Sequence, residues 1–243
     1  MKIVFFKQNK ILNSTILTNI VIALVVCLVG LVAFVSPAIS VAYMKSGEAI
    51  YQGSPDNKYV SLMINVYWGT EYVEPMLKIL KDNDAQATFF VGGTWVAQNN
   101  DVFRLICDSN NEIASHGYHH KDHAKISKQA NIDEISNTHT LVKSLSGIDM
   151  NLFAPPSGSY NKTTLEVAKS LGYKTIMWSK DTIDWRDKNT KLIYNRATTN
   201  LSNGDLILMH PTKNTLEAFD MIVKEIKKQG YEIVTVSQNI KDL

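Results

Sequence analysis

Segments patterned as buried β-strands alternate with segments of helical spacing along most of the chain. The expected strands are residues 59–66, 87–91, 112–115, 152–154, 174–179, 205–209 and 231–236. The expected helices are residues 71–81, 95–106, 133–145, 162–171, 192–199 and 216–228. Because strands that alternate with helices form parallel sheets, the pattern predicts a single α/β domain.

The number of strands decides between two parallel architectures. A complete eight-stranded barrel takes roughly 200 residues or more, so a distorted seven-stranded (β/α) barrel fits this chain better. An open doubly wound sheet is the alternative. No glycine-rich phosphate loop follows any expected strand, which argues against a nucleotide-binding form of that alternative.

The first 43 residues differ in composition from the rest of the chain. Three lysines, Lys2, Lys7 and Lys10, precede an uncharged run over residues 13–43. Its apolar part, residues 16–35, suits a membrane-spanning helix of roughly 20 residues. The preceding positive charge favours a cytoplasmic N-terminus. We predict a single-pass transmembrane anchor in the cell membrane with the domain outside the cytoplasm. Ser40-Val41-Ala42 leaves open a cleaved signal sequence and a secreted domain.

A polar segment follows the apolar run, and the charge of the remainder limits its partners. Residues 44–57 contain two glycines and a proline and are expected to be a linker before a domain at 58–243. Without residues 1–43, the chain has 22 basic and 23 acidic residues. This balance does not predict a nucleic-acid partner. Cys107 is the only cysteine after residue 43, so a core rather than an internal disulfide stabilises the domain.

Polar residues stand where several expected strands end. Asn65 ends the first strand, His116 follows the third, Asp184 follows the fifth and His210 follows the sixth. The carboxyl ends of parallel barrel strands meet at one rim, where loops build active sites. We therefore expect these residues to share one site.

Two histidines in the sequence Ser-His-Gly-Tyr-His-His are spaced for a metal ion. His116 and His120 are about one helical turn apart, so both rings can face one point. Imidazole binds zinc and similar ions, and catalytic sites usually have three protein ligands. His119 and His123 have the same spacing, but we predict His116 and His120 as the ligands. Asp122 and His123 remain open as a third ligand.

The other expected side chains would move protons or contact a sugar. His210 suits a general acid because imidazole titrates near neutral pH, although a histidine at a strand end can also be a core residue. Asp181 or Asp184 could orient it through a hydrogen bond, while the other caps a turn. Tyr160 and Trp185 offer faces for sugar stacking, or pack internally.

The order of these motifs resembles the NodB-type polysaccharide deacetylases, carbohydrate esterase family 4. The resemblance covers roughly residues 59–240 and rests on the following motifs: Ala87-Thr88-Phe89-Phe90-Val91, His116-x-x-x-His120, Pro155-Pro156-x-Gly158-Ser159-Tyr160-Asn161, Asp181-x-x-Asp184-Trp185 and Leu208-Met209-His210. Trp68-Gly69-x-Glu71-Tyr72 further resembles the sporulation-associated Gram-positive branch.

The resemblance implies hydrolysis of N-acetyl groups on cell-wall or chitin-like glycan, with peptidoglycan as the expected partner. It implies zinc or a similar ion on His116 and His120, and His210 as the acid. Pro156, Tyr160 and Trp185 would contact substrate.

Four family positions differ in this chain. Asn65 and Val66 replace two adjacent aspartates that act as base and metal ligand. Ala154 replaces an arginine, and Ser157 a tyrosine. An amide cannot take a proton from water, although Asn65 could orient a water or a glycan hydroxyl. We expect a slow or altered deacetylase. The alternative is a non-catalytic glycan-binding pseudoenzyme. A barrel glycosidase ranks last because its two carboxylates would come from one loop.

Overall fold

The computed structural model describes residues 19–27 and 48–243. Residues 19–27 are helical and exposed. The anchor predicted within residues 1–43 therefore lies mostly outside the described residues. In the two described stretches, no helix is both long enough and apolar enough to span a bilayer.

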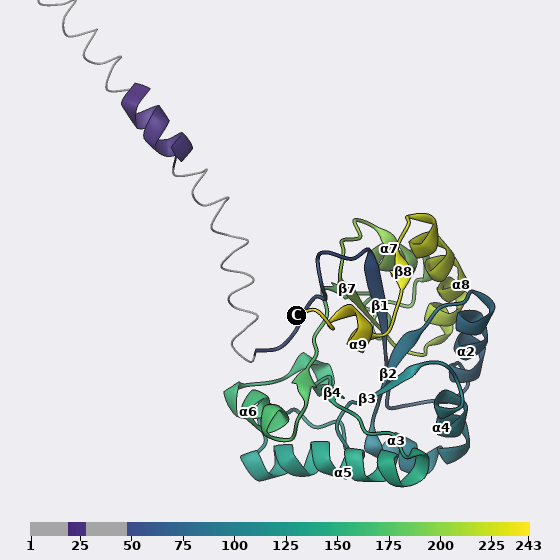
Figure 1. Cartoon of the computed structure of the whole chain (residues 1–243). Helices are drawn as coiled ribbons and strands as arrows, with labels where there is room; N and C mark the ends of the chain where they lie inside the picture. The colour runs from purple at the N-terminus through teal and green to yellow at the C-terminus, as the bar shows by residue number, and fades with distance from the viewer. Residues whose placement is uncertain (1–18, 28–47) are drawn as a thin grey trace, which may run out of the picture. The chain divides into compact units, whose positions relative to one another are not determined.

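Residues 48–243 build a parallel sheet that is covered by helices (Figure 1). The strands are β1 (Tyr59–Val66), β2 (Ala87–Val91), β3 (Glu112–Ser115), β4 (Leu152–Phe153), β5 (Lys174–Thr175), β6 (Lys180–Asp181), β7 (Asp205–Met209) and β8 (Glu232–Ile233). Their order across the sheet is β5-β4-β3-β2-β1-β7-β6, and β8 pairs with the start of β1. The prediction of a parallel (β/α) barrel-like fold is confirmed.

The single strand predicted over residues 174–179 is wrong, because only its first two residues form a strand, β5, and the next strand, β6, begins after it at Lys180. Strand β5 pairs with β4, and β6 pairs with β7. Between them, Ile176 forms a bridge with Ile50. Gln52 forms a second bridge with Asp205 at the start of β7. Residues 50–52 belong to the segment that was expected to be a linker. They instead form β-bridges with the barrel between β5 and β7, where β5 and β6 pair with different strands.

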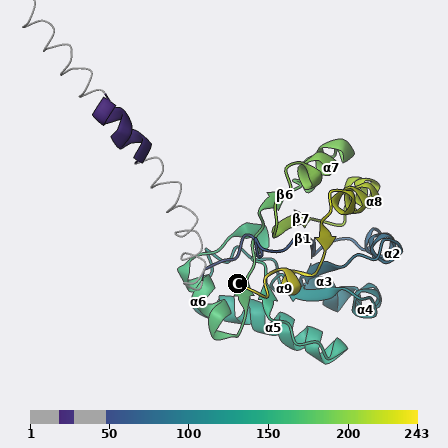
Figure 2. The ribbon, with the colours of Figure 1, turned by 45° about the horizontal axis from the view of Figure 1, so that its top comes forward.

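The helices lie around the outside of the strands, and Figure 2 shows α7, α8, α2, α4 and α5 in an arc around them. They are α2 (Val73–Asp82), α3 (Gly93–Gln98), α4 (Asn100–Cys107), α5 (Lys128–Ser146), α6 (Lys162–Ser170), α7 (Thr190–Thr198), α8 (Lys213–Lys228) and the short α9 (Val236–Asn239). The helix predicted over residues 95–106 is two helices, because Asn99 leaves the helical conformation with φ −130° and ψ 45°.

Strand β1 separates two apolar cores by the alternation of its side chains. Its members Leu62, Ile64 and Val66 belong to a large cluster that includes residues of α2 and α8. Met63 belongs to a smaller cluster inside the barrel, together with Phe90 and Leu206 of neighbouring strands. By the same alternation, Asn65 lies on the face of β1 that is directed into the barrel, and Val66 lies on the face directed toward the outer helices.

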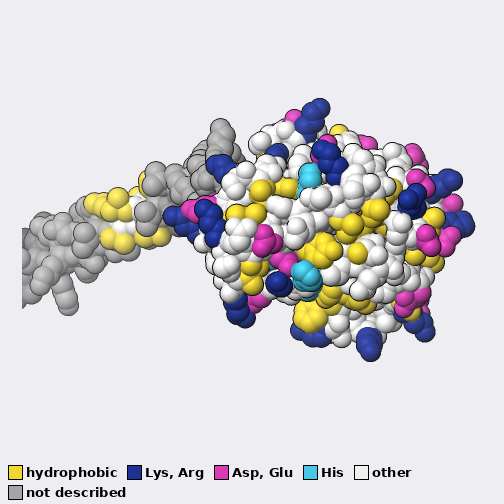
Figure 3. Space-filling model, turned by 90° about the horizontal axis from the view of Figure 1, so that it is seen from below, with side chains coloured by type: hydrophobic (Ala, Val, Ile, Leu, Met, Phe, Trp, Pro, Cys, Tyr) yellow, Lys and Arg dark blue, Asp and Glu magenta, His cyan; other side chains and the backbone are white. Residues whose placement is uncertain are grey.

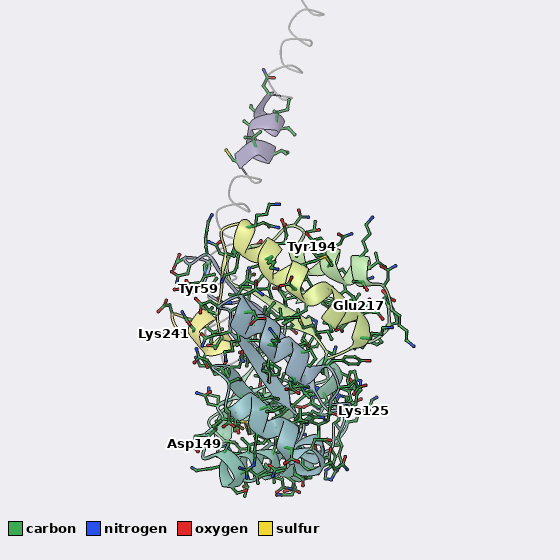
Figure 4. The ribbon with its side chains drawn as sticks, turned by 90° about the vertical axis from the view of Figure 1, so that its right-hand side faces the viewer. Tyr59, Lys125, Asp149, Tyr194, Glu217 and Lys241 are labelled. Atoms are coloured by element: carbon green, nitrogen blue, oxygen red, sulfur yellow. The ribbon has the colours of Figure 1, made fainter. Side chains whose placement is uncertain are left out.

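The loops that follow the strands gather at one side of the domain. Figure 4 shows Tyr59, which begins β1, on the opposite side from Lys125 and Glu217, which follow β3 and β7. Asp149, which precedes β4, lies on the same side as Tyr59. On the face shown in Figure 3, basic and acidic side chains lie side by side.

Candidate functional site

A cavity of about 280 Å³ lies where the carboxyl ends of the inner strands meet. Its lining consists of Asn65, Tyr67, His116, His120, Ser157, Trp178, Asp181, Trp185, Leu208 and His210. The structure thus brings together six of the residues predicted from sequence, which lie at the end of, or in the loops after, four different strands, β1, β3, β6 and β7. Asp184 lies beneath the lining and contacts His210.

His116 and His120 face one another at one side of the pocket, with ring centroids 5.1 Å apart. The Nδ1–H of His116 donates to the Ala154 carbonyl at 2.8 Å, so its Nε2 carries the lone pair. Burial, together with the nearby His120, holds the pKa of His116 well below its usual value. Burial also lowers the pKa of His120. Both rings are therefore neutral at pH 7, the form that binds a metal ion.

A buried carboxylate on α5 fixes the loop that carries these two histidines. Glu134 accepts hydrogen bonds from the backbone N–H groups of Tyr118 and His119 at 2.8 and 2.7 Å. It also accepts the ring Nδ1–H of His119 at 2.9 Å. The loop contains His120 at φ +56°, a conformation that is unfavourable for a residue other than glycine and needs such support. His119 is therefore a structural partner of Glu134 rather than a ligand in the pocket.

His210 and Asp184 form a buried pair at the pocket. Asp184 Oδ1 accepts the Nδ1–H of His210 at 2.8 Å. Asp184 Oδ2 accepts the His210 backbone N–H and the Thr215 hydroxyl, both at 2.6 Å. The pair fixes the ring orientation of His210 and leaves its Nε2 for the pocket, as a general acid requires.

The loop between β6 and α7 holds this carboxylate in place through a strained residue. Ile183, a β-branched residue, has φ +54°. Asp181 lines the pocket and accepts the Ile183 backbone N–H at 2.7 Å, while the Thr182 hydroxyl donates to the Leu208 carbonyl. The sequence predicted that one of the two aspartates caps a turn and that the other orients His210. Asp181 caps the turn, and Asp184 orients the histidine.

Asn65 and Val66 end β1 with different surroundings. Asn65 lines the pocket and is only 3 % exposed. Its Oδ1 is buried and has no hydrogen-bond donor among the described residues. Val66 is fully buried in the apolar cluster that includes the outer helices. Of these two positions, only that of Asn65 contributes to the pocket lining.

Aromatic side chains that were not predicted as site residues connect His120 to His210. The ring of Tyr67 stacks on His120 with centroids 3.6 Å apart. Tyr67 meets Trp68 edge to face at 4.1 Å, and Trp68 stacks on His210 at 5.2 Å. Trp178 also lines the pocket. The sequence feature that could have indicated them is the pair Tyr67-Trp68 directly after the first strand. Such a pair is equally typical of aromatic residues that only pack in a core.

Two expected substrate contacts lie outside the pocket lining. Pro156 is buried in the short helix η1 (Pro156–Gly158) and lies beside Gly117. The Tyr160 hydroxyl lies 2.7 Å from that of Tyr51. Trp185, in contrast, lines the pocket with a side chain that is 56 % exposed, which suits sugar stacking.

The donor set for a metal ion is incomplete in this chain. Asp122 is hydrogen-bonded to Ser159 and paired with Lys125, and the His123 Nδ1–H donates to Asn131. Within residues 19–27 and 48–243, no three His, Cys, Asp or Glu side chains are grouped to hold a metal ion. Because a catalytic zinc site takes three protein ligands, His116 and His120 alone do not complete one.

Comparison with known proteins places this geometry in a family. The model of the polysaccharide deacetylase family matches residues 52–176. The chain belongs to that family. A peptidoglycan-N-acetylglucosamine deacetylase of Bacillus cereus is 31% identical over 202 residues, which cover 81% of this chain and 94% of the relative. The family resemblance predicted from the motifs is confirmed.

Two further relatives bear on how complete this deacetylase-family site is. The protein YlxY of Bacillus subtilis is 37% identical over 191 residues, which cover 79% of this chain. The match spans 60% of the length of YlxY. The crystal structure of a CE4 family pseudoenzyme from Bacillus anthracis is 36% identical with a TM-score of 0.78, covering 80% of this chain and 69% of that one. A mutant of that pseudoenzyme has restored enzymatic activity.

Proposed function

We propose that residues 58–243 bind an N-acetylated glycan of the peptidoglycan type in the pocket and slowly hydrolyse its N-acetyl groups. The observation that carries this proposal is the buried pair of His210 and Asp184 at the pocket. His210 would donate a proton to the leaving amine nitrogen as its bond to the acetyl carbon breaks. Asn65 cannot act as a base, so the water attacks without general-base help and the reaction is slow.

The substrate class is supported by the relatives and by the walls of the pocket. The deacetylase of Bacillus cereus acts, by its name, on N-acetylglucosamine of peptidoglycan. Tyr67, Trp178 and Trp185 give the pocket aromatic surfaces, which pack well against sugar rings. Deacetylases of this family are generally metal-dependent. We propose that His116 and His120 retain weak affinity for zinc or a similar ion, with no step of the reaction assigned to it.

The proposed activity is tested by acetate release from N-acetylglucosamine oligomers and from peptidoglycan fragments. We expect purified residues 48–243 to release acetate slowly but above a blank without protein. The proposed hydrolysis is overturned if the protein releases no acetate above that blank. An enzyme-linked acetate assay over several hours, with the Bacillus cereus relative as positive control, has the required sensitivity.

A non-catalytic glycan-binding protein is the second candidate, and one observation favours it. An amide occupies the position of the family base, and its oxygen is unpaired in the pocket. The similar chain from Bacillus anthracis is a pseudoenzyme. Binding of the oligomers without any acetate release would select this second function.

We further propose that the apolar run at residues 16–35 anchors the domain to the cell membrane, outside the cytoplasm. The support is the length of this run and the three lysines before it. Full-length protein should remain in the membrane fraction at its unprocessed mass and be digested by protease added outside the membrane. A shortened, soluble product would instead indicate cleavage after the small residues near Ala42.

A further inference from the structure

The side chain of Asn65 has hydrogen-bonding capacity that the protein does not use. It lines the pocket, it is nearly fully buried, and its Oδ1 has no donor among the described residues. Buried polar atoms in folded proteins are nearly always paired, so an unpaired one at a pocket calls for an explanation. A ligand that supplies the missing donor is one such explanation.

An asparagine differs from the family aspartate in what it can recognise. Its amide offers both an acceptor and two donors, whereas an ionised carboxylate only accepts. A half-turn of the amide exchanges Oδ1 and Nδ2, and Oδ1 has no protein hydrogen bond to lose in that turn. Either end can therefore be presented to a ligand.

The amide of Asn65 is itself neutral and matches a neutral ligand group that has both a donor and an acceptor. Among the described residues, the one carboxylate in the pocket lining is that of Asp181, which already accepts the Ile183 backbone N–H. The apolar Leu208 also lines the pocket. An acetamido group is neutral, has one N–H donor and one carbonyl acceptor, and ends in a methyl group. The ammonium group of a deacetylated sugar is charged and has no acceptor.

We propose that Asn65 is a specificity-determining residue that pairs with the intact acetamido group of an N-acetylated sugar. Its Oδ1 accepts the acetamido N–H, or its Nδ2 donates to the acetyl oxygen. This inference rests on the proposed function, in which glycan occupies the pocket. It adds that the site distinguishes acetylated from deacetylated glycan and holds the acetylated form.

The test is calorimetric binding of N-acetylglucosamine oligomers and of the same oligomers after complete deacetylation. We expect the wild-type domain to bind the acetylated form about 10-fold more tightly. Asn65→Leu keeps the size but removes the hydrogen bonds, and should abolish that preference. Asn100→Leu is the matched control, because Asn100 Oδ1 is also buried and unpaired but lies in α4, and it should keep the preference.

The outcomes separate this inference from the function on which it rests. Equal affinity of the wild type for both oligomers, or a preference that survives in Asn65→Leu, overturns the role of Asn65 while glycan binding stands. Binding of neither oligomer overturns the proposed function as well. If Asn65→Leu fails to fold, Asn65→Ala replaces it, and loss of the preference is again expected.

Discussion

Replacing Asn65 by aspartate is expected to raise the rate of acetate release by about 10²-fold or more, because a positioned general base typically contributes 10²–10⁴-fold. Asn65 lines the pocket that also contains His210, so a carboxylate at this position would face the substrate. A base must be ionised to take a proton. The rate should therefore rise with pH as the new carboxylate loses its proton, which a pH profile of acetate release measures.

The single substitution is a cleaner test than restoring both family aspartates. Val66 is fully buried in the outer apolar cluster, and a carboxylate there would be unpaired. We expect Val66→Asp to lower the free energy of unfolding by several kcal/mol. Folded Asn65→Asp protein without a gain in rate would show that the losses at Val66 and Ala154 are decisive. The mutant pseudoenzyme with restored activity shows that a related site can be reactivated.

Replacing Asp184 by asparagine is expected to remove about 10²-fold or more of the acetate release measured in the Asn65→Asp background. Asp184 accepts the His210 ring Nδ1–H, the His210 backbone N–H and the Thr215 hydroxyl. An asparagine has only one oxygen for these three donors, and its NH₂ group opposes at least one of them. The His210 ring then loses the orientation that leaves Nε2 for the substrate.

Asp205→Asn is the matched control for this prediction. Asp205 is also buried, begins the strand that His210 follows, and accepts hydrogen bonds from Ser179 Oγ and the Ser202 backbone N–H. Both substitutions should lower stability, each by about 1–3 kcal/mol in thermal or denaturant unfolding. Only Asp184→Asn should lower the rate of the folded protein. A similar loss of rate in both variants would contradict the assigned role of Asp184.

The order of the elements was predictable from sequence because buried strands and amphipathic helices have different periods. The split of residues 174–179 was not, because it depends on pairing with Ile50, which is remote in the chain. The division of the helix at Asn99 depends on a single backbone conformation that spacing does not reveal.

For the site, the positions of the strand ends were sufficient to predict which loops meet. They were not sufficient to predict which histidines line the pocket and which have structural roles. His116 and His120 have the same spacing as His119 and His123. Their environments differ because Glu134 binds His119 and Asn131 binds His123. Both of these partners lie on α5, and no pattern in the loop itself indicates them.

The central claim is that the site retains His210 as the general acid and lacks the general base at Asn65. Its most direct test compares acetate release by the single variant Asn65→Asp with that by the double variant Asn65→Asp, His210→Ala. Both proteins are assayed at equal folded concentration on the same N-acetylglucosamine oligomer. The account predicts a gain of about 10²-fold in the single variant and its loss in the double variant. Equal rates in the two variants would show that His210 is not the acid and would contradict the account.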